Sequence, residues 1–197
     1  MAGGTEGNAR LTTVTGVVLL VLLAALGITI LRVHPLLEEH MFLGMLLIGP
    51  VALKMGCTGY RFVRYYTAEP RYRRKGPPEL AMRILAPLVV LSTVVVFASG
   101  VALMLVGPSS RGALLPVHKV SFFVWLSATA LHVLGHLPDL QRVLAPGGTE
   151  LAEFDERRAG RGGRALALGG MLVAGLVLGV ISISQFAPWA NAHFPHH

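Results

Sequence analysis

The chain has 197 residues, 53% of them hydrophobic, and its mean hydropathy of +0.63 exceeds that of ordinary soluble domains. This composition excludes a soluble globular protein and indicates an integral membrane protein with one domain, residues 1–197. The formal net charge is +7, but the basic residues cluster between hydrophobic stretches, so membrane topology explains them better than nucleic-acid binding. The single cysteine, Cys57, excludes an internal disulfide framework.

Apolar stretches predict an all-α bundle of five transmembrane helices. The predicted spans are residues 11–31, 36–60, 81–106, 114–137 and 165–186. The first is too long for the apolar region of a signal peptide, and no cleavage site follows it cleanly, so we expect an uncleaved helix. In the last span, Gly175 and Gly179 form a small-xxx-small pair that favours close helix contact.

The basic residues of the loops predict the orientation of the spans. Residues 61–83 include seven arginines or lysines and residues 138–164 include five, whereas the opposite side has three, Arg32, Arg111 and Lys119. We therefore expect a cytoplasmic N-terminus, two cytoplasmic loops and an external C-terminus. Only three of the 17 basic residues are lysine, which favours a GC-rich bacterial source and hence the bacterial cytoplasmic membrane.

The stretch 114–137 carries three histidines, His118, His132 and His136. An ionisable residue within a membrane span is costly and indicates a functional site. On a helix with about 100° per residue, the three side chains lie within about 40° of one direction, and His118 and His132 are roughly 21 Å apart along the axis. Imidazoles that face a bundle interior hold haem iron in membrane proteins. The simpler alternative is a set of polar contacts between helices.

His40 is the histidine best placed to pair with His118. The two spans run in the same direction, and each histidine comes four residues after the start of its span, so the two reach the same depth. One imidazole from each of two helices is the bis-histidine arrangement of a b-type haem, which is suited to electron transfer. Gly44, one turn beyond His40, would leave room for a porphyrin against the backbone.

Other side chains near these histidines have two interpretations each. Phe122, Phe123 and Trp125 either pack on the porphyrin or simply face lipid and protein core. Glu38 and Glu39 either are solvated at the membrane interface or hydrogen-bond a ligand imidazole and raise its basicity.

The segments His-Lys-Val-Ser-Phe-Phe-Val-Trp (118–125) and Leu-His-Val-Leu-Gly-His (131–136) resemble the helix signature of small bacterial membrane cytochromes b. These are four-helix proteins of the cytochrome b-561 type, related to the membrane anchors of ferric reductases and respiratory dehydrogenases. His-Met-Phe-Leu-Gly (40–44) resembles their other ligand helix, and the resemblance covers about half of the chain. It implies a four-helix haem-binding core within the five-helix bundle, one or two haems b, and electron transfer across the membrane. His40 and His118 would be the outer ligand pair, and His132 and His136 the inner histidines.

The resemblance has one departure, at Lys54. The two-haem pattern places another histidine about fourteen residues after the first one, and this chain has Lys54 there. Lys54 therefore snorkels toward the cytoplasmic interface, pairs with a haem propionate, or ligates iron after losing its proton. His132 and His136 would then bind a propionate, a quinone or a proton in transit. We expect one haem b, on the outer side, with a second one left open.

Two further functions fit the same residues. A structural or assembly subunit would use its histidines only for hydrogen bonds between helices. A protein that handles zinc or copper would use the histidines of the outer side, His34, His40, His118, His193, His196 and His197. No catalytic substrate site is visible, so we expect an electron-transfer subunit of an oxidoreductase. Its expected partners are the lipid bilayer, a quinone or a redox protein at the outer face, and further copies or subunits of a complex, but not nucleic acid.

Overall fold

The computed structural model describes residues 5–67, 80–135 and 161–192 of the chain. This part is all-helical, without any strand, and five of its helices are long and apolar enough to cross a membrane. The predicted class and the predicted number of spans are thus confirmed, and a multi-pass membrane protein is indicated. The helices are α1 (Thr5–Leu31), α2 (Leu37–Tyr66), α4 (Leu80–Val106), α5 (Leu114–Gly135), α8 (Arg161–Ile181) and the short α9 (Ala187–Ala190), with 3-10 helices η1 (Pro108–Ser110) and η2 (Ile183–Gln185).

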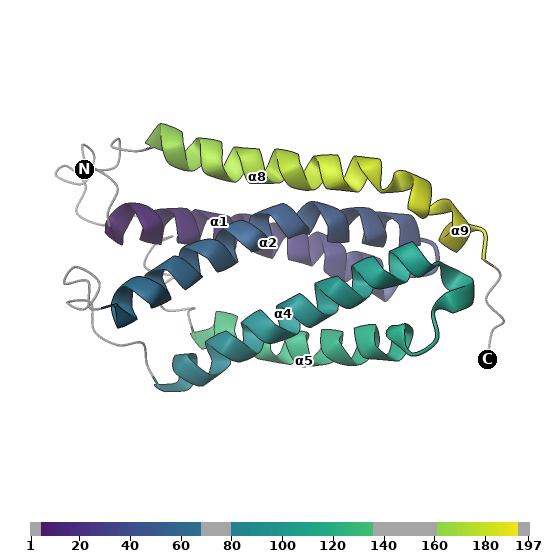
Figure 1. Cartoon of the computed structure of the whole chain (residues 1–197), viewed down its shortest axis with the longest axis horizontal. Coiled ribbons are helices and arrows are strands. Elements are labelled where there is room, and N and C mark those ends of the chain that lie inside the picture. The colour runs from purple at the N-terminus through teal and green to yellow at the C-terminus, as the bar shows by residue number, and fades with distance from the viewer. Residues whose placement is uncertain (1–4, 68–79, 136–160, 193–197) are drawn as a thin grey trace.

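The five long helices lie side by side and alternate in direction, so that α1 begins at one end of the bundle and α9 lies at the other (Figure 1). We call the end with the links 32–36 and 107–113 the outer end, and the opposite end the inner end. Helix α2 is central: it packs against α1, α8 and α4, while α5 packs mainly against α4. Figure 1 shows α8 on one side of the α1–α2 pair and the α4–α5 hairpin on the other.

Helices α2 and α8 meet backbone to backbone. A Cβ on Gly49 would overlap the carbonyl oxygen of Met171, and a Cβ on Gly175 would overlap that of Leu46. Pro50, buried within α2, has no N–H, so the Leu46 carbonyl lacks its usual helical donor. The backbone of α8 at Gly175 packs against this freed carbonyl, which explains why only glycine fits there.

The second glycine of the predicted pair contacts a ring rather than a backbone. A Cβ on Gly179 would come within 2.9 Å of Phe42 Cε2. Phe42 in turn packs on the buried cluster Met45, Met104 and Phe186, which joins α2, α4 and the segment after α8 at the outer end. The expected close contact at Gly175 and Gly179 is therefore confirmed, with α2 as the partner helix.

Two helix ends differ from the predicted spans. Helix α2 continues to Tyr66, six residues beyond the predicted 60. Helix α8 ends at Ile181 instead of 186, and the chain passes through η2 into α9. Pro188 explains this break, because its ring would clash with the carbonyl four residues earlier in a continuous helix. The bend buries Phe186 and Trp189, which are 3% and 7% exposed.

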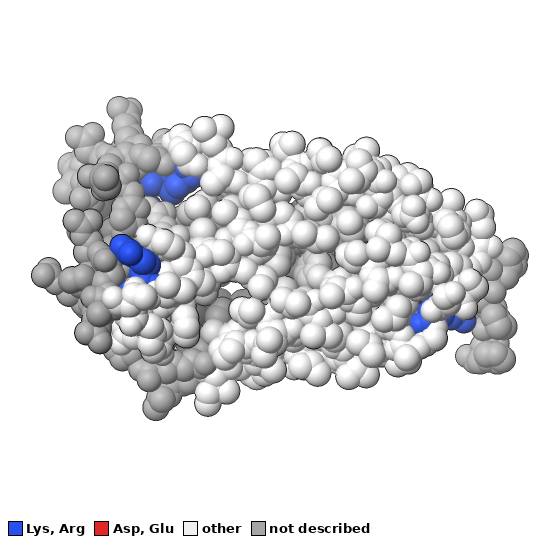
Figure 2. Space-filling model, viewed as in Figure 1, with Lys and Arg blue, Asp and Glu red and all other residues white. Residues whose placement is uncertain are grey.

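One face of the bundle carries its charged side chains near the two ends. On the face drawn in Figure 2, the lysine and arginine side chains lie near the two ends, and the surface between them is uncharged. Large apolar side chains are exposed along this middle region, among them Ile84, Leu91 and Val120. Such a surface is compatible with contact to lipid.

Candidate functional site

His40 lies in the first turn of α2 and contacts α1. Its Nδ1 atom is 3.0 Å from the hydroxyl oxygen of Thr29, which is itself buried. That hydroxyl donates its single proton to the Leu26 carbonyl, at 2.6 Å. The Thr29 oxygen must therefore act as the acceptor for His40, so Nδ1 carries the imidazole proton. Nε2 is left as the unprotonated nitrogen of the neutral ring.

His118 lies in the second turn of α5 and contacts α4. Its Nδ1 atom is 3.0 Å from the Val96 carbonyl oxygen and 3.1 Å from the Ser99 hydroxyl. A carbonyl can only accept, so Nδ1 again carries the proton and Nε2 again keeps its lone pair. The ring lies against Gly100, where a Cβ would be 3.1 Å from Cε1 of the imidazole. Any larger residue at this position would press on the ring.

The two histidines therefore have the same tautomer, and Nε2 is the atom with a lone pair in each. Neither Nε2 has a hydrogen-bond partner among the described residues. The helices that carry the two histidines, α2 and α5, pack mainly against other helices rather than against each other. A neutral imidazole with Nδ1–H bonded to a carbonyl or hydroxyl is the form in which histidine binds metals through Nε2.

Gly44 borders open space. A Cβ on this residue would meet no atom within 4 Å, in contrast to the glycines that contact α8. Gly44 lies one turn beyond His40 and about 40° around the helix from it. That it makes room for a porphyrin stays a prediction.

The aromatic side chains of α5 divide into two groups. Phe122 and Trp125 are half-buried, with ring centroids 6.2 Å apart, and the Trp125 indole donates to the Thr93 hydroxyl at 3.0 Å. Phe123 is 65% exposed and points away from the bundle. Phe122 and Trp125 remain available to line the interior, whereas Phe123 has the position expected of a lipid-facing residue.

Lys54 lies fourteen residues after His40 and also faces α1. Its ammonium group donates to the Thr12 carbonyl at 2.7 Å, and a Cβ on Gly16 would be 3.0 Å from Nζ. The same seam between α1 and α2 contains a bond from the Asn8 amide to the Cys57 carbonyl, at 3.2 Å. The structure therefore places Lys54 in a polar contact between two helices near the inner end.

The remaining predicted residues are less well placed or lie outside the described residues. His132 is half-buried on α5, about fourteen residues from His118 on the same face. Glu38 and Glu39 are exposed, and the partner of His40 is Thr29 rather than either carboxylate. His34 is exposed in the link after α1. Four histidines fall outside the described residues: His136, His193, His196 and His197.

Sequence reasoning missed the groups that hold the two imidazoles, namely Thr29, Ser99, Gly100 and the Val96 carbonyl. A signal existed for two of them, since Thr29 and Ser99 are isolated hydroxyls within apolar spans. Buried hydroxyls of this kind commonly bond to their own helix, as Ser99 also does with the Val95 carbonyl at 2.7 Å. The sequence alone therefore could not show that they also contact histidines.

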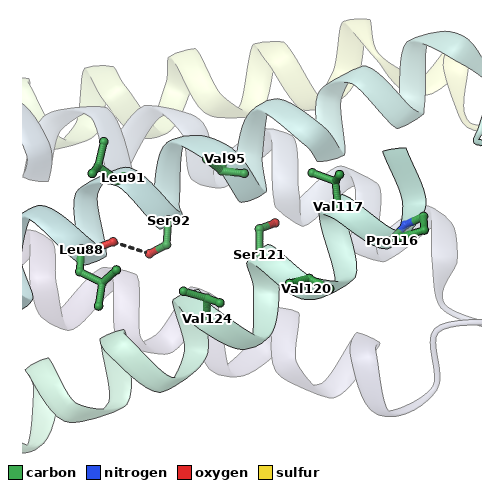
Figure 3. Close-up of a pocket in the computed structure, with 9 residues that line it drawn as sticks. All are labelled: Leu88, Leu91, Ser92, Val95, Pro116, Val117, Val120, Ser121 and Val124. Atoms are coloured by element: carbon green, nitrogen blue, oxygen red, sulfur yellow. Dashed lines mark hydrogen bonds between the residues drawn. The ribbon is translucent and has the colours of Figure 1, made fainter. Parts of the chain in front are cut away.

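The described surface also has a hollow on the outside of the α4–α5 hairpin. This open groove of about 500 Å³ is lined by apolar side chains such as Leu91, Val95 and Val124, with two serines, Ser92 and Ser121 (Figure 3). Both serine hydroxyls donate to carbonyls of their own helix, at 2.7 and 3.0 Å. The groove therefore offers nothing to orient a polar ligand, and His118 is not part of its lining.

Within the described part of the chain, no three His, Cys, Asp or Glu side chains come together as a metal site. Comparison with known proteins gives no match: no family model, curated protein or solved structure is similar to this chain. The assignment of a function therefore rests on the residues and on their geometry.

Proposed function

We propose that this chain is a multi-pass membrane haem b protein that carries electrons, with His40 and His118 as the two axial ligands. The observation that supports this proposal is the shared state of the two imidazoles. Each ring has Nδ1–H bonded to an oxygen and Nε2 left with its lone pair. Two such donors from two helices at the same depth match the donor set of a six-coordinate b-type haem.

Several residues around His40 and His118 would support haem binding. Thr29 holds the His40 ring, and the Val96 carbonyl and Ser99 hold the His118 ring, so the ligand atoms are oriented before anything binds. Gly44 leaves space beside His40, which a planar macrocycle would need. When bound, a bis-histidine haem supplies reversible one-electron transfer, without an open position for oxygen.

We propose one haem per chain, because the inner end of the bundle lacks a second ligand pair among the described residues. A second site would need a ligand on α2 opposite His132, and the residue there is Lys54. Its ammonium group is engaged with the Thr12 carbonyl of α1 at 2.7 Å. Iron ligation would require Lys54 both to lose its proton and to break this contact, so we assign it to the α1–α2 seam rather than to a cofactor.

The proposed location is a bacterial cytoplasmic membrane with the N-terminus inside and the C-terminus outside. The asymmetry of basic residues in the sequence supports this orientation, which would place the haem near the outer face. Electrons would then pass from a membrane donor such as a quinol to an acceptor at that face. A reporter fused after His197 should be active only outside, and activity confined to the cytoplasm would reverse the orientation.

An absorption spectrum of the purified chain tests the main proposal. A sharp reduced-minus-oxidised band, with a pyridine haemochrome ratio near one per chain, is the expected result. Bound zinc or copper without that band would favour the metal-handling alternative. The absence of both, in protein purified from cells with ample haem, would favour a structural subunit.

A further inference from the structure

The last turns of α2 project beyond the length that a membrane requires. This helix has 30 residues, or about 45 Å at about 1.5 Å per residue. Crossing the hydrocarbon core takes only about 20 residues. Because α2 begins at the outer end with Leu37, its last ten or so residues reach the inner boundary of the membrane and pass it.

The final seven residues of α2, Tyr60 to Tyr66, carry aromatic and basic side chains and no acidic ones. We call this segment the α2 end. Arg61 is exposed, as are four large side chains: Tyr60 (53%), Phe62 (62%), Val63 (55%) and Tyr66 (62%). These positions point in different directions around the helix, so exposed side chains surround the α2 end in the described part of the chain. A contiguous patch of exposed apolar side chains of this kind marks a site of contact with a membrane or a partner.

The rings and the guanidinium groups of the α2 end lie among one another. The rings of Phe62 and Tyr66 have centroids 4.5 Å apart, and Tyr65 meets Tyr66 edge-on at 5.3 Å. The guanidinium carbon of Arg64 lies 5.8 Å from the centre of the Tyr60 ring. Aromatic rings favour the headgroup level of a bilayer, where an adjacent arginine can reach a lipid phosphate.

The described residues of the outer end differ from this. The aromatic side chains Phe186 and Trp189 are buried there. The exposed Arg32 is accompanied by the exposed carboxylates of Glu38 and Glu39. Among the described residues, the combination of exposed rings and basic side chains without carboxylates is therefore found at the α2 end and not beside Arg32.

We propose that the α2 end is a binding surface for anionic phospholipids. Arg61 and Arg64 bind the headgroup phosphate, and the exposed rings lie at the level of the lipid glycerol. Charge complementarity selects an anionic lipid, and the apolar rings select a lipid over a free phosphate ion. This surface is independent of the haem proposal, since it lies at the opposite end of α2 from His40.

Native mass spectrometry of the detergent-purified full-length chain, titrated with phosphatidylglycerol, tests the proposal. Each basic residue near a membrane surface strengthens binding of anionic lipid roughly 5-fold, so R61Q/R64Q should bind about 30-fold more weakly. The matched control R32Q/R111Q removes two arginines from the outer end and should bind as the unchanged chain does. An equal loss in both double variants, or no loss in R61Q/R64Q, would overturn the proposal.

Three further measurements identify what binds to the α2 end. Phosphatidylcholine should bind at least tenfold more weakly than phosphatidylglycerol to the unchanged chain, a comparison that needs no variant to fold. Inorganic phosphate should not displace the lipid, and displacement would assign the arginines to a free anion instead. If R61Q/R64Q changed only the mass of the oligomer and not lipid binding, the surface would belong to contacts between copies of the chain.

Discussion

His40 and Lys54 occupy the same face of α2, fourteen residues apart, and both contact α1, yet they use this contact differently. His40 bonds to the Thr29 hydroxyl through Nδ1 and keeps a second nitrogen for a ligand. Lys54 donates its only side-chain nitrogen, Nζ, to the Thr12 carbonyl at 2.7 Å. The contact with α1 thus orients the Nε2 atom of His40 toward a proposed ligand at the outer end. At the inner end the contact with α1 uses the Nζ atom of Lys54 itself.

The comparison extends to the helices opposite. At the outer end, α5 presents His118, held by the Val96 carbonyl at 3.0 Å and flanked by Gly100. At the inner end, α5 presents His132, which has no matching histidine on α2. His40 is a ligand candidate because its Nε2 remains available after Nδ1 has bonded to Thr29. Lys54 has a single side-chain nitrogen, which already bonds to Thr12.

Replacing His118 should have the largest effect. H118A removes one of the two proposed iron ligands, so haem affinity should fall by more than the roughly 100-fold that loss of a ligand's outer partner causes. The reduced-minus-oxidised spectrum and the haem content per chain measure this loss. K119A, at an exposed neighbouring position, is the control and should keep full haem content. A low-spin spectrum of full intensity in H118A would show that the ligand assignment is wrong.

Gly100 should be the next most sensitive position. In G100L the new side chain would enter the space of the His118 ring, whose Cε1 would lie 3.1 Å from the added Cβ. Overpacking of this kind costs about 1–3 kcal/mol, which should appear as weaker haem binding and a lower Tm. G56L is the matched control, because a Cβ at Gly56 meets nothing within 4 Å. Equal effects in both variants would indicate a general cost of leucine in these helices.

Replacing Thr29 should have a smaller effect on haem binding, together with a change in the midpoint potential. T29V keeps the shape of the side chain but leaves His40 Nδ1–H without its acceptor, so haem affinity should fall about tenfold. The midpoint potential should rise, since a less basic imidazole stabilises the oxidised iron less. T13V is the control, because the Thr13 hydroxyl bonds only to the Ala9 carbonyl of its own helix. A potential that is unchanged in T29V would remove Thr29 from the site.

Lys54 should have the smallest effect on haem. K54M removes the bond to the Thr12 carbonyl but leaves an apolar side chain in the seam, so stability should fall by about 1 kcal/mol. Haem content should stay near one per chain in both proteins. A ratio near two in the unchanged chain that drops to one in K54M would mean that lysine ligates a second haem, contrary to the assignment above.

The amino-acid pattern by itself determined the coarse features of this protein. Long apolar stretches predict five spans because a helix must satisfy its own backbone hydrogen bonds in a membrane. The spacing of Gly175 and Gly179 predicts a close contact because small residues four apart form one smooth stripe. Position within a span predicts a shared depth for His40 and His118, since each residue of a helix advances about 1.5 Å along its axis.

Tertiary packing decided which groups each polar side chain contacts. Helical periodicity gives the direction in which Lys54 points along α2, but it does not say which helix occupies that direction. Only the assembled bundle shows that Thr12 faces Lys54, that Thr29 faces His40 and that Val96 and Gly100 face His118. These contacts join residues far apart in the chain, and their energies depend on how neighbouring helices are placed. That placement follows from backbone approaches such as Gly49 against α8, which no single helix encodes.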